Sequence, residues 1–134
     1  MPGRLLRRRL RSRRFEVRDL SMTPEFLPGD RLLVDVTAFR SRPPAAGQVV
    51  VLRDPEDGRR FLLKRVAARE GEPVPGPLPP GDDLRVPAGH LYLLSDQRAG
   101  GRDSRRFGAV PLGSIVGLAW FRYAPSPRRG PLPP

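Results

Sequence analysis

The sequence contains no cysteine, one histidine, and only one lysine among its 25 basic residues. The lack of cysteine excludes disulfide bonds and thiolate metal sites, and it fits a reducing compartment. Arginine stays charged at neutral pH, so the side chains that could take a proton from a hydroxyl are His90, Lys64 and the carboxylates. His90 follows a Pro-Ala-Gly turn, where we expect a structural or exposed role.

The sequence also lacks a run of about 20 apolar residues, the length that spans a bilayer, and it lacks the apolar stretch of a signal peptide. We therefore expect no transmembrane segment and a cytoplasmic protein. Like-charge blocks are usually disordered, so residues 1–14 are predicted to form a disordered basic arm. The arm contains Arg4, Arg7, Arg8, Arg9, Arg11, Arg13 and Arg14, with Leu5, Leu6 and Leu10 as its leucines. It is either a solvated tail or a peripheral contact with an anionic membrane, worth about 1 kcal/mol per basic residue.

The net charge of +11 raises an alternative, a basic non-enzymatic module that binds nucleic acid. The chain shows no aromatic or glycine spacing typical of a known RNA-binding fold. An arginine arm by itself gives only salt-sensitive affinity that is blind to sequence. We therefore expect no nucleic-acid partner and keep this class as the alternative to an enzyme.

The composition predicts one mainly β domain with little helix. A chain of 134 residues supports a single modest core, and 18 prolines with 14 glycines favour short strands and many turns. Strands are predicted at residues 15–20, 31–36, 48–53, 61–66, 91–94 and 113–123, with a connecting loop over 72–83. The predicted fold is a small antiparallel β-sheet or partly open barrel over residues 15–124, followed by a disordered proline-rich tail over 125–134.

A hydroxyl and an amine stand out within this outline. Ser21 follows the strand predicted at 15–20 and precedes a Pro-Gly-Asp turn, a position that suits a nucleophile. Lys64 lies in an apolar strand between Leu62 and Val66, where burial would lower its pKa from about 10.4 towards neutrality. The alternatives are an ordinary strand-turn corner at Ser21 and a lysine that reaches solvent from a strand edge.

A third stretch, residues 86–108, supplies motifs that complete a pattern. The three motifs are Ser21-Met22-x-Pro24 with Pro28-Gly29-Asp30, then Lys64-Arg65-Val66, then Ser95-Asp96-Gln97 with Asp103-Ser104-Arg105 and Gly108. In this order they resemble the signal peptidase I family of Ser/Lys peptidases. The small size and the missing anchor make the chain most similar to the soluble branch of nickel-type superoxide dismutase maturation proteases.

The resemblance implies a serine endopeptidase with a Ser21/Lys64 dyad and a fold of the signal peptidase type. It implies no cofactor and no metal. The expected partner is a precursor protein or leader peptide, specifically the precursor of a nickel-type superoxide dismutase. General signal peptidase activity at a membrane surface is the alternative within the same family, and a catalytically inactive member is another.

The resemblance also implies supporting residues and reveals two departures. The backbone N–H of Ser21 would bind the oxyanion, and Asp103 would pair with Arg105 to hold the last loop beside Lys64. The residues implied to line the substrate pockets, or else to form plain core, are Phe15, Val17, Met22, Phe26, Leu62 and Leu63. Asp19 stands where the family has a hydroxyl donor to the oxyanion. Gly101 stands where the family commonly has a serine that orients the lysine, and Ser95 or Ser104 could replace it.

Overall fold

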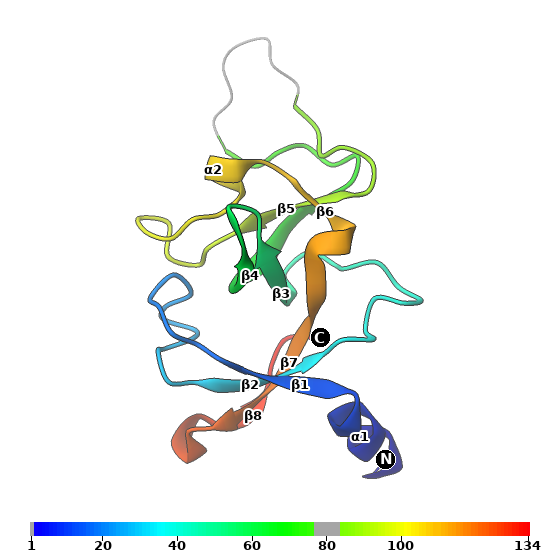
Figure 1. The fold of residues 1–134 in the computed structure, drawn as a ribbon, viewed down its shortest axis with the longest axis vertical. Coiled ribbons are helices and arrows are strands. Elements are labelled where there is room, and N and C mark those ends of the chain that lie inside the picture. The colour runs from blue at the N-terminus through cyan, green and yellow to red at the C-terminus, as the bar shows by residue number, and fades with distance from the viewer. Residues whose placement is uncertain (1, 77–83) are drawn as a thin grey trace.

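The protein is a curled antiparallel half-barrel with little helix, as the sequence predicted (Figure 1). A computed structural model describes residues 2–76 and 84–134, and eight strands within these ranges form one sheet. The strands are β1 (Ser12–Glu16), β2 (Arg31–Asp35), β3 (Val49–Asp54), β4 (Asp57–Arg69), β5 (His90–Leu94), β6 (Val110–Pro111), β7 (Ile115–Ala124) and β8 (Gly130–Pro131). Their order is β1-β2-β7-β3-β4-β5-β6, and β8 pairs with β7.

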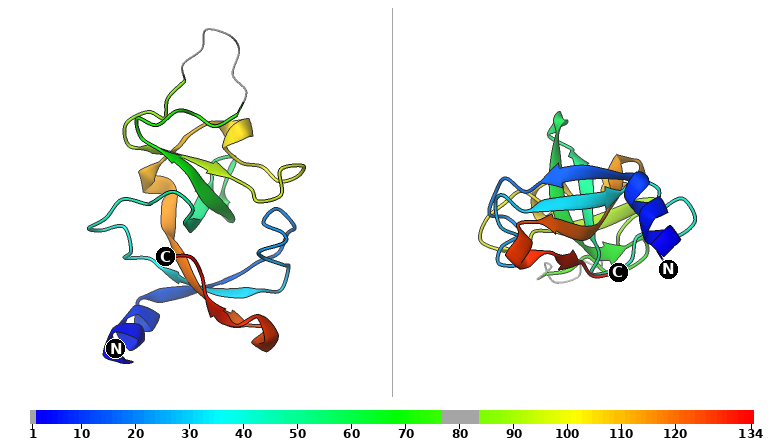
Figure 2. Two further views of the ribbon diagram at one scale, coloured as in Figure 1. Left: turned by 180° about the vertical axis from the view of Figure 1, so that it is seen from behind. Right: turned by 90° about the horizontal axis from the view of Figure 1, so that it is seen from below.

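Strand β7 joins the two halves of the sheet. It pairs with β2 and β8 in the half that carries β1, and with β3 in the half that carries β4, β5 and β6 (Figures 1 and 2). Gly117 permits this arrangement, because a Cβ atom there would lie 2.5 Å from the carbonyl oxygen of Asp35 in β2. The backbones of β7 and β2 can therefore approach more closely than any side chain at position 117 would allow.

The core lies on both faces of β3. Val49 and Val51 pack into one apolar cluster, and Val50 and Leu52 pack into a second. Successive strand side chains point to opposite faces, so an unbroken apolar run matches a strand that is covered on both sides. The curl of the sheet provides this cover by folding its two halves around β3.

The predicted strands agree with the structure except at the first. The strand expected over 15–20 is wrong, because β1 covers Ser12–Glu16 and residues 17–20 lie outside it. The backbone continues to pair beyond β1, since the N–H of Val17 donates to the carbonyl of Asp30. The chain then bends away, and this bend directs the segment that contains Ser21 towards β4.

The N-terminal arm differs from the disorder predicted for residues 1–14. Residues Pro2–Leu10 form helix α1, and the next residues enter β1. The side chain of Arg8 donates to Asp35 at 3.0 Å and lies over the ring of Trp120, 4.6 Å from its centroid. These tertiary contacts offset part of the charge repulsion that favours disorder in an isolated arginine-rich segment.

The C-terminal segment also differs from the predicted disorder over 125–134. It forms the short helix η2 (Ser126–Arg128) and then β8, and the side chain of Leu132 is buried. Arg128 donates to the buried carboxylate of Asp30 at 2.7 Å. A buried leucine and a buried ion pair thus fix a segment whose composition resembles that of a linker. The domain limits 15–124 remain a prediction.

Within the described residues, two further short helices lie between the strands, the first between β5 and β6 and the second between β6 and β7. Helix α2 (Ser104–Phe107) begins after Asp103, whose side chain accepts from the N–H of Arg105, and η1 (Leu112–Ser114) precedes β7. The loop predicted over 72–83 is described only in part, because residues 77–83 lie outside the described residues. In its described part, Pro73 forms a β-bridge with Arg85.

Candidate active site

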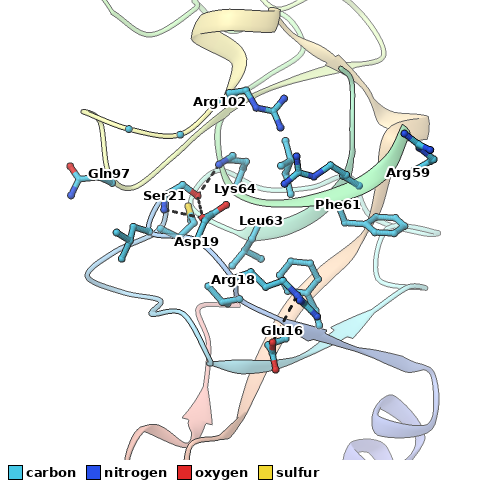
Figure 3. A pocket seen from close by; sticks show the side chains of 18 of the residues that line it. Glu16, Arg18, Asp19, Ser21, Arg59, Phe61, Leu63, Lys64, Gln97 and Arg102 are labelled. Atoms are coloured by element: carbon cyan, nitrogen blue, oxygen red, sulfur yellow. Dashed lines mark hydrogen bonds and ion pairs between the residues drawn. The ribbon is translucent and has the colours of Figure 1, made fainter. Parts of the chain in front are cut away.

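The structure brings Ser21 and Lys64 into direct contact across 43 residues of sequence. Lys64 Nζ donates a hydrogen bond to Ser21 Oγ at 3.0 Å (Figure 3). Both residues are buried, with 6% of Ser21 and 1% of Lys64 exposed. Ser21 comes from the loop after β1, and Lys64 comes from the middle of β4. The hydroxyl and the amine that the sequence singles out therefore meet in one site.

The loop that carries Ser21 is held from two sides. The N–H of Gln97 donates to the carbonyl of Ser21 at 2.8 Å, which ties the loop to the chain after β5. The side chain of Met22 is buried, and its sulfur accepts from the N–H of Asp96. Farther along, the N–H of Leu27 donates to the Asp30 carboxylate and closes the Pro-Gly-Asp turn. Ser21 thus presents its hydroxyl from a fixed backbone.

The surroundings of Lys64 favour its neutral form. Burial lowers the pKa of the Lys64 amine below its ordinary value of 10.5. The negative charges of Asp19 and Asp103 oppose this shift, and the positive charges of Arg102 and Arg105 add to it. The net direction is downward, so the amine releases its proton more readily than an exposed lysine does.

The carboxylate of Asp19 holds both donors of Ser21. Its Oδ1 atom accepts from Ser21 Oγ at 2.7 Å and from the backbone N–H of Ser21 at 3.0 Å. Burial alone would raise the pKa of Asp19, but the two Ser21 hydrogen bonds and the charges of Lys64 and Arg60 lower it overall. The group is therefore an anion at neutral pH. It occupies the backbone N–H that was predicted to bind the oxyanion.

The Ser104 hydroxyl has a hydrogen-bond partner, and the Ser95 hydroxyl has none among the described residues. Ser104 Oγ accepts from the N–H of Leu93 at 2.9 Å, so this hydroxyl supports β5. Ser95 Oγ is buried with no hydrogen-bond partner among the described residues. A Cβ atom at Gly101 would lie 2.8 Å from Ser95 Oγ and 3.5 Å from Lys64 Nζ. The Ser95 hydroxyl thus lies in the space that a side chain at position 101 would need.

The predicted ion pair between Asp103 and Arg105 is present. Arg105 Nη2 lies 2.8 Å from Asp103 Oδ2, and the same carboxylate accepts from the N–H of Ser95 at 2.8 Å. Burial opposes ionisation of Asp103, but the hydrogen bonds from Arg105 and Ser95 outweigh it and lower its pKa to about 2. This charged carboxylate ties the start of α2 to the end of β5. It holds the 95–105 loop beside Lys64.

A cleft of about 660 Å³ opens beside Ser21 and Lys64. Five of the six apolar residues predicted for substrate pockets line it, namely Phe15, Val17, Met22, Leu62 and Leu63. Phe26 is a correction: its side chain is fully buried in the core, under the guanidinium of Arg122, and does not line the cleft. The backbone turns between Met22 and Phe26, where the Phe26 N–H donates to the Met22 carbonyl, and this turn directs the Phe26 ring into the core.

Sequence reasoning missed the arginines of the cleft. Arg14, Arg18, Arg59 and Arg60 line it together with the apolar residues. The available signal was the Arg-Arg-Phe triplet, which occurs at residues 13–15 before Ser21 and at 59–61 before Lys64. A third copy, residues 105–107, lies in α2 and does not line the cleft.

Comparison with known proteins shows that the chain is a member of a family of serine endopeptidases. It belongs to the family described as signal peptidase, peptidase S26, which matches residues 5–76 and 77–124. The match includes Ser21, Lys64 and the cleft described above.

Individual relatives agree with the family. The chain is 36% identical over 120 residues to the mitochondrial ATP-independent inner membrane protease subunit 1b of Arabidopsis thaliana, covering 85% of this chain and 71% of that relative. It is 32% identical over 139 residues to the probable signal peptidase I-1 of Synechocystis sp., covering 84% and 71%. A signal peptidase I structure from Enterococcus faecalis superposes with a TM-score of 0.50 at 20% identity, covering 57% of this chain and 97% of that one. The last likeness concerns the fold.

Helices long and apolar enough to cross a bilayer do not occur among residues 2–76 and 84–134.

Proposed function

We propose that the protein is a serine endopeptidase that removes an N-terminal leader from a precursor protein, with Ser21 as nucleophile and Lys64 as general base. The observation that carries the proposal is the 3.0 Å contact between a buried amine and the Ser21 hydroxyl. A serine hydroxyl needs a base to accept its proton, and a lysine serves only when its pKa is depressed. Burial depresses the pKa of Lys64 in this way.

The proposed reaction requires a rearrangement of hydrogen bonds. In the free protein the Ser21 hydroxyl donates to Asp19, and the Lys64 amine donates to Ser21 Oγ. In the reaction, neutral Lys64 accepts the hydroxyl proton while Ser21 Oγ forms a bond to the scissile carbonyl carbon. Lys64 then returns the proton to the leaving amine, and the peptide C–N bond breaks, which leaves an acyl ester on Ser21 Oγ. A water molecule that gives its proton to Lys64 then attacks this ester, and the proton passes to Ser21 Oγ as the carboxylate product leaves. The backbone N–H of Ser21 must leave Asp19 to bind the carbonyl oxygen.

The substrate would lie as an extended strand between the segment that leads to Ser21 and β4. Both segments line the cleft, which supports this placement. Phe15 is half-buried and offers apolar surface on the segment that leads to Ser21. Val17, Met22, Leu62 and Leu63 line the cleft as the outer edge of the core, with little of each side chain exposed. Pockets between them would accept small side chains next to the scissile bond.

The proposed substrate is the precursor of a nickel-type superoxide dismutase. The choice of this precursor follows the resemblance of the three motifs to the maturation protease branch of the family. The alternative is broader leader removal at a membrane surface. It is supported by relatives whose names are signal peptidase and inner membrane protease.

The membrane alternative has a structural counterpart in α1. Arg8 faces the body of the protein, while the three leucines of the helix, Leu5, Leu6 and Leu10, are exposed. Apolar residues normally cover the core, so a helix that turns its leucines outward beside several arginines fits an interfacial contact with anionic lipid. We propose this helix as the peripheral contact.

The direct test is cleavage of the superoxide dismutase precursor by purified protein, followed by mass spectrometry of the released leader. Ser21→Ala and Lys64→Ala should each abolish cleavage, and the matched control Ser41→Ala, an exposed loop serine, should retain it. Cleavage should rise with pH, because Lys64 acts only after it loses its proton and its pKa lies below 10.5. Equal activity of Lys64→Ala and the parent would disprove the dyad. Loss of activity in a chelator would indicate a metal instead.

A further inference from the structure

The two walls of the cleft carry a repeated basic element. One wall, residues 14–18, exposes Arg14 and Arg18, and the other wall, at the start of β4, exposes Arg59 and Arg60. Figure 3 shows Arg18 and Arg59 on these two walls. On each wall an arginine pair precedes a phenylalanine and then the segment that ends at Ser21 or Lys64. The basic residues therefore belong to the same two segments that would hold an extended substrate.

These arginines are only weakly neutralised by the protein. Arg14 and Arg60 form no hydrogen bond or ion pair with their side chains among the described residues. Arg18 approaches Glu16 at 3.9 Å with 84% of its side chain exposed, and such contacts contribute little. Arg102 differs, because Asp54 and Glu56 bind its guanidinium. The unsatisfied charge of the cleft thus lies on its two walls.

The carboxylates of the cleft have other partners. Asp19 accepts both donors of Ser21. Glu16 lies between two arginines, Arg18 at 3.9 Å and Arg31 at 3.6 Å. The cleft therefore keeps an excess of positive charge close to the place where a peptide would lie. Such a focused field attracts and orients anionic ligands.

The position of Arg60 relative to Lys64 determines which residue of a bound peptide can reach it. Arg60 precedes Lys64 by four residues and lines the same cleft. Four residues span at most about 14 Å, and less here, because the β3–β4 register shifts beside residues 58–60. The charge of Arg60 reaches across to Asp19, because it helps to lower the pKa of that carboxyl. An extended peptide rises about 3.3 Å per residue, so a residue three to four positions from the scissile bond comes within reach of Arg60.

We propose that this cleft selects extended precursor segments that carry aspartate or glutamate about four residues from the scissile bond, read by Arg60 and Arg18. The inference rests on the proposed peptidase function and adds its substrate class. A carboxylate beside these two arginines completes two ion pairs that the free protein lacks. Precursors with lysine or arginine at the same place meet like charge and are rejected.

The first experiment reads cleavage directly. A degenerate synthetic peptide library is digested by the parent protein, and the products are sequenced by mass spectrometry. Asp and Glu should be enriched three to five residues from the cut on one side. The variant Arg60→Glu should lose this enrichment and favour Lys or Arg there instead. Arg42→Glu is the matched control, because Arg42 is exposed, does not line the cleft, and changes the net charge equally.

The second experiment reads binding without cleavage. Fluorescent sixteen-residue peptides with Glu or Gln at the varied position are titrated against Ser21→Ala protein. The Glu peptide should bind about fivefold more tightly, a difference that Arg60→Glu removes and Arg42→Glu preserves. The preference should fade in high salt, because exposed ion pairs are screened.

The outcomes separate the inference from the function beneath it. Cleavage that depends on Ser21 but shows no acidic enrichment overturns the inference and leaves the peptidase. Binding that favours Glu through Arg60, with no cleavage of any peptide, overturns the peptidase and retains an acidic-peptide site. Equal effects of Arg60→Glu and Arg42→Glu overturn the inference, because net charge alone would then explain the preference.

Discussion

Asp19 places an anion where a peptidase must stabilise one. Its Oδ1 atom holds the backbone N–H of Ser21 at 3.0 Å and the hydroxyl at 2.7 Å. Two negative oxygens cannot share one N–H, so the carboxylate must withdraw before a carbonyl oxygen can use that donor. The same charge raises the pKa of Lys64 and delays formation of the neutral amine. Asp19 therefore opposes the proposed reaction in two ways.

Replacing Asp19 should accordingly speed cleavage. Asp19→Ser removes the charge and supplies a hydroxyl that can donate, so kcat/KM should rise, by about tenfold if one oxyanion donor is gained. The acid limb of the pH profile should move to lower pH, because the pKa of Lys64 falls without its anionic neighbour. The measurement is the pH dependence of precursor cleavage.

Asp19→Asn is the matched variant, because it removes the charge and keeps the size. A larger gain in Asp19→Ser than in Asp19→Asn would assign the difference to hydroxyl donation, whereas equal gains would assign it to charge. Slower cleavage by both variants, with unchanged folding, would contradict the proposed role. Asp19 would then support the nucleophile.

Gly101 should be intolerant of any side chain. A Cβ atom there would lie 2.7 Å from Ser21 Cβ and 2.8 Å from Ser95 Oγ, and its φ of +85° disfavours other residues. Gly101→Ala should lower stability by about 1–3 kcal/mol and abolish cleavage, measured by thermal unfolding and by the precursor assay. Gly100→Ala is the control, because nothing lies within 4 Å of its added Cβ. Parent-like activity of Gly101→Ala would show that the pocket around Lys64 can open.

At this scale the sequence predicted the pair but not its neighbours. Lys64 was predictable because it is the one lysine of the sequence and lies in an apolar strand. Ser21 was predictable from its position between a predicted strand and a Pro-Gly-Asp turn, and the two side chains do meet. The dual hydrogen bond of Asp19 was not predictable, because it depends on how the loop turns after β1. The choice between Ser95 and Ser104 likewise depends on which hydroxyl is already bound, and only the packed structure shows that Ser104 binds Leu93.

Among the elements, α1 carries its own prediction. Its leucines are exposed, with 78% of Leu10 accessible, so an anionic bilayer could bury them. The double variant Leu6→Ser with Leu10→Ser should weaken sedimentation with vesicles of phosphatidylserine and phosphatidylcholine by about tenfold, through lost apolar burial. Unfolding of the protein should be unchanged.

The matched control for α1 is Leu112→Ser, an exposed leucine in η1. It should bind vesicles as the parent does. If the parent does not bind anionic vesicles, or if Leu112→Ser is equally impaired, the membrane contact of α1 is wrong. Binding of RNA in place of vesicles, with the same arginines required, would support the nucleic-acid alternative.

The strands were more predictable than the two ends of the chain. Apolar runs bounded by Pro, Gly and Asp indicated β2, β3, β5 and β7, because burial and turns dominate their local pattern. The ends were predicted to be disordered from charge and proline content. Their order depends on partners far away in sequence, namely Asp35 and Trp120 for α1 and Asp30 for the C-terminal segment. The composition of a local segment does not show which distant residues it will contact.

For the whole molecule, buried carboxylates bound to arginine predict sensitivity to acid. Asp30, Asp54 and Asp103 are buried and bonded to arginine, and each has a lowered pKa. Burial opposes the shift at Asp30 and Asp103, where hydrogen bonds from backbone N–H groups and arginines outweigh it. At Asp54 the hydrogen bond from Arg102 leads.

The sign of the effect follows from these lowered pKa values. A carboxyl with a lowered folded pKa stabilises the protein above its ordinary value of 3.8, and this stability disappears as the pH falls through the folded value, about 2 for Asp103. The midpoint temperature of thermal unfolding should therefore be nearly constant from pH 7 to 5 and fall steeply below pH 4. The ionised Asp103 carboxylate alone should contribute about 2 kcal/mol to the free energy of unfolding at neutral pH.

Asp103→Asn provides the check on this assignment. The variant should be less stable than the parent at pH 6, and the difference should shrink as the pH approaches 2, measured by circular dichroism melts. A constant difference across this range would mean that Asp103 acts through packing and not through its charge. A parent that gains stability in acid would contradict the prediction altogether.

Because β7 joins the two halves of the sheet, the distance between Ser21 and Lys64 depends on the whole sheet. Ser21 is carried by the half that contains β1 and β2, Lys64 is carried by the half that contains β3 and β4, and β7 pairs with both. At this junction the backbone of Gly117 lies close against Asp35 and Val34 of β2, where an added Cβ atom would lie within 3 Å of both residues. The methyl group of Gly117→Ala would push β7 away from β2 and rotate one half of the sheet relative to the other. The Ser21 hydroxyl would then move away from the Lys64 amine. Strain introduced at β7 would therefore change the contact between Ser21 and Lys64, although neither residue lies on that strand.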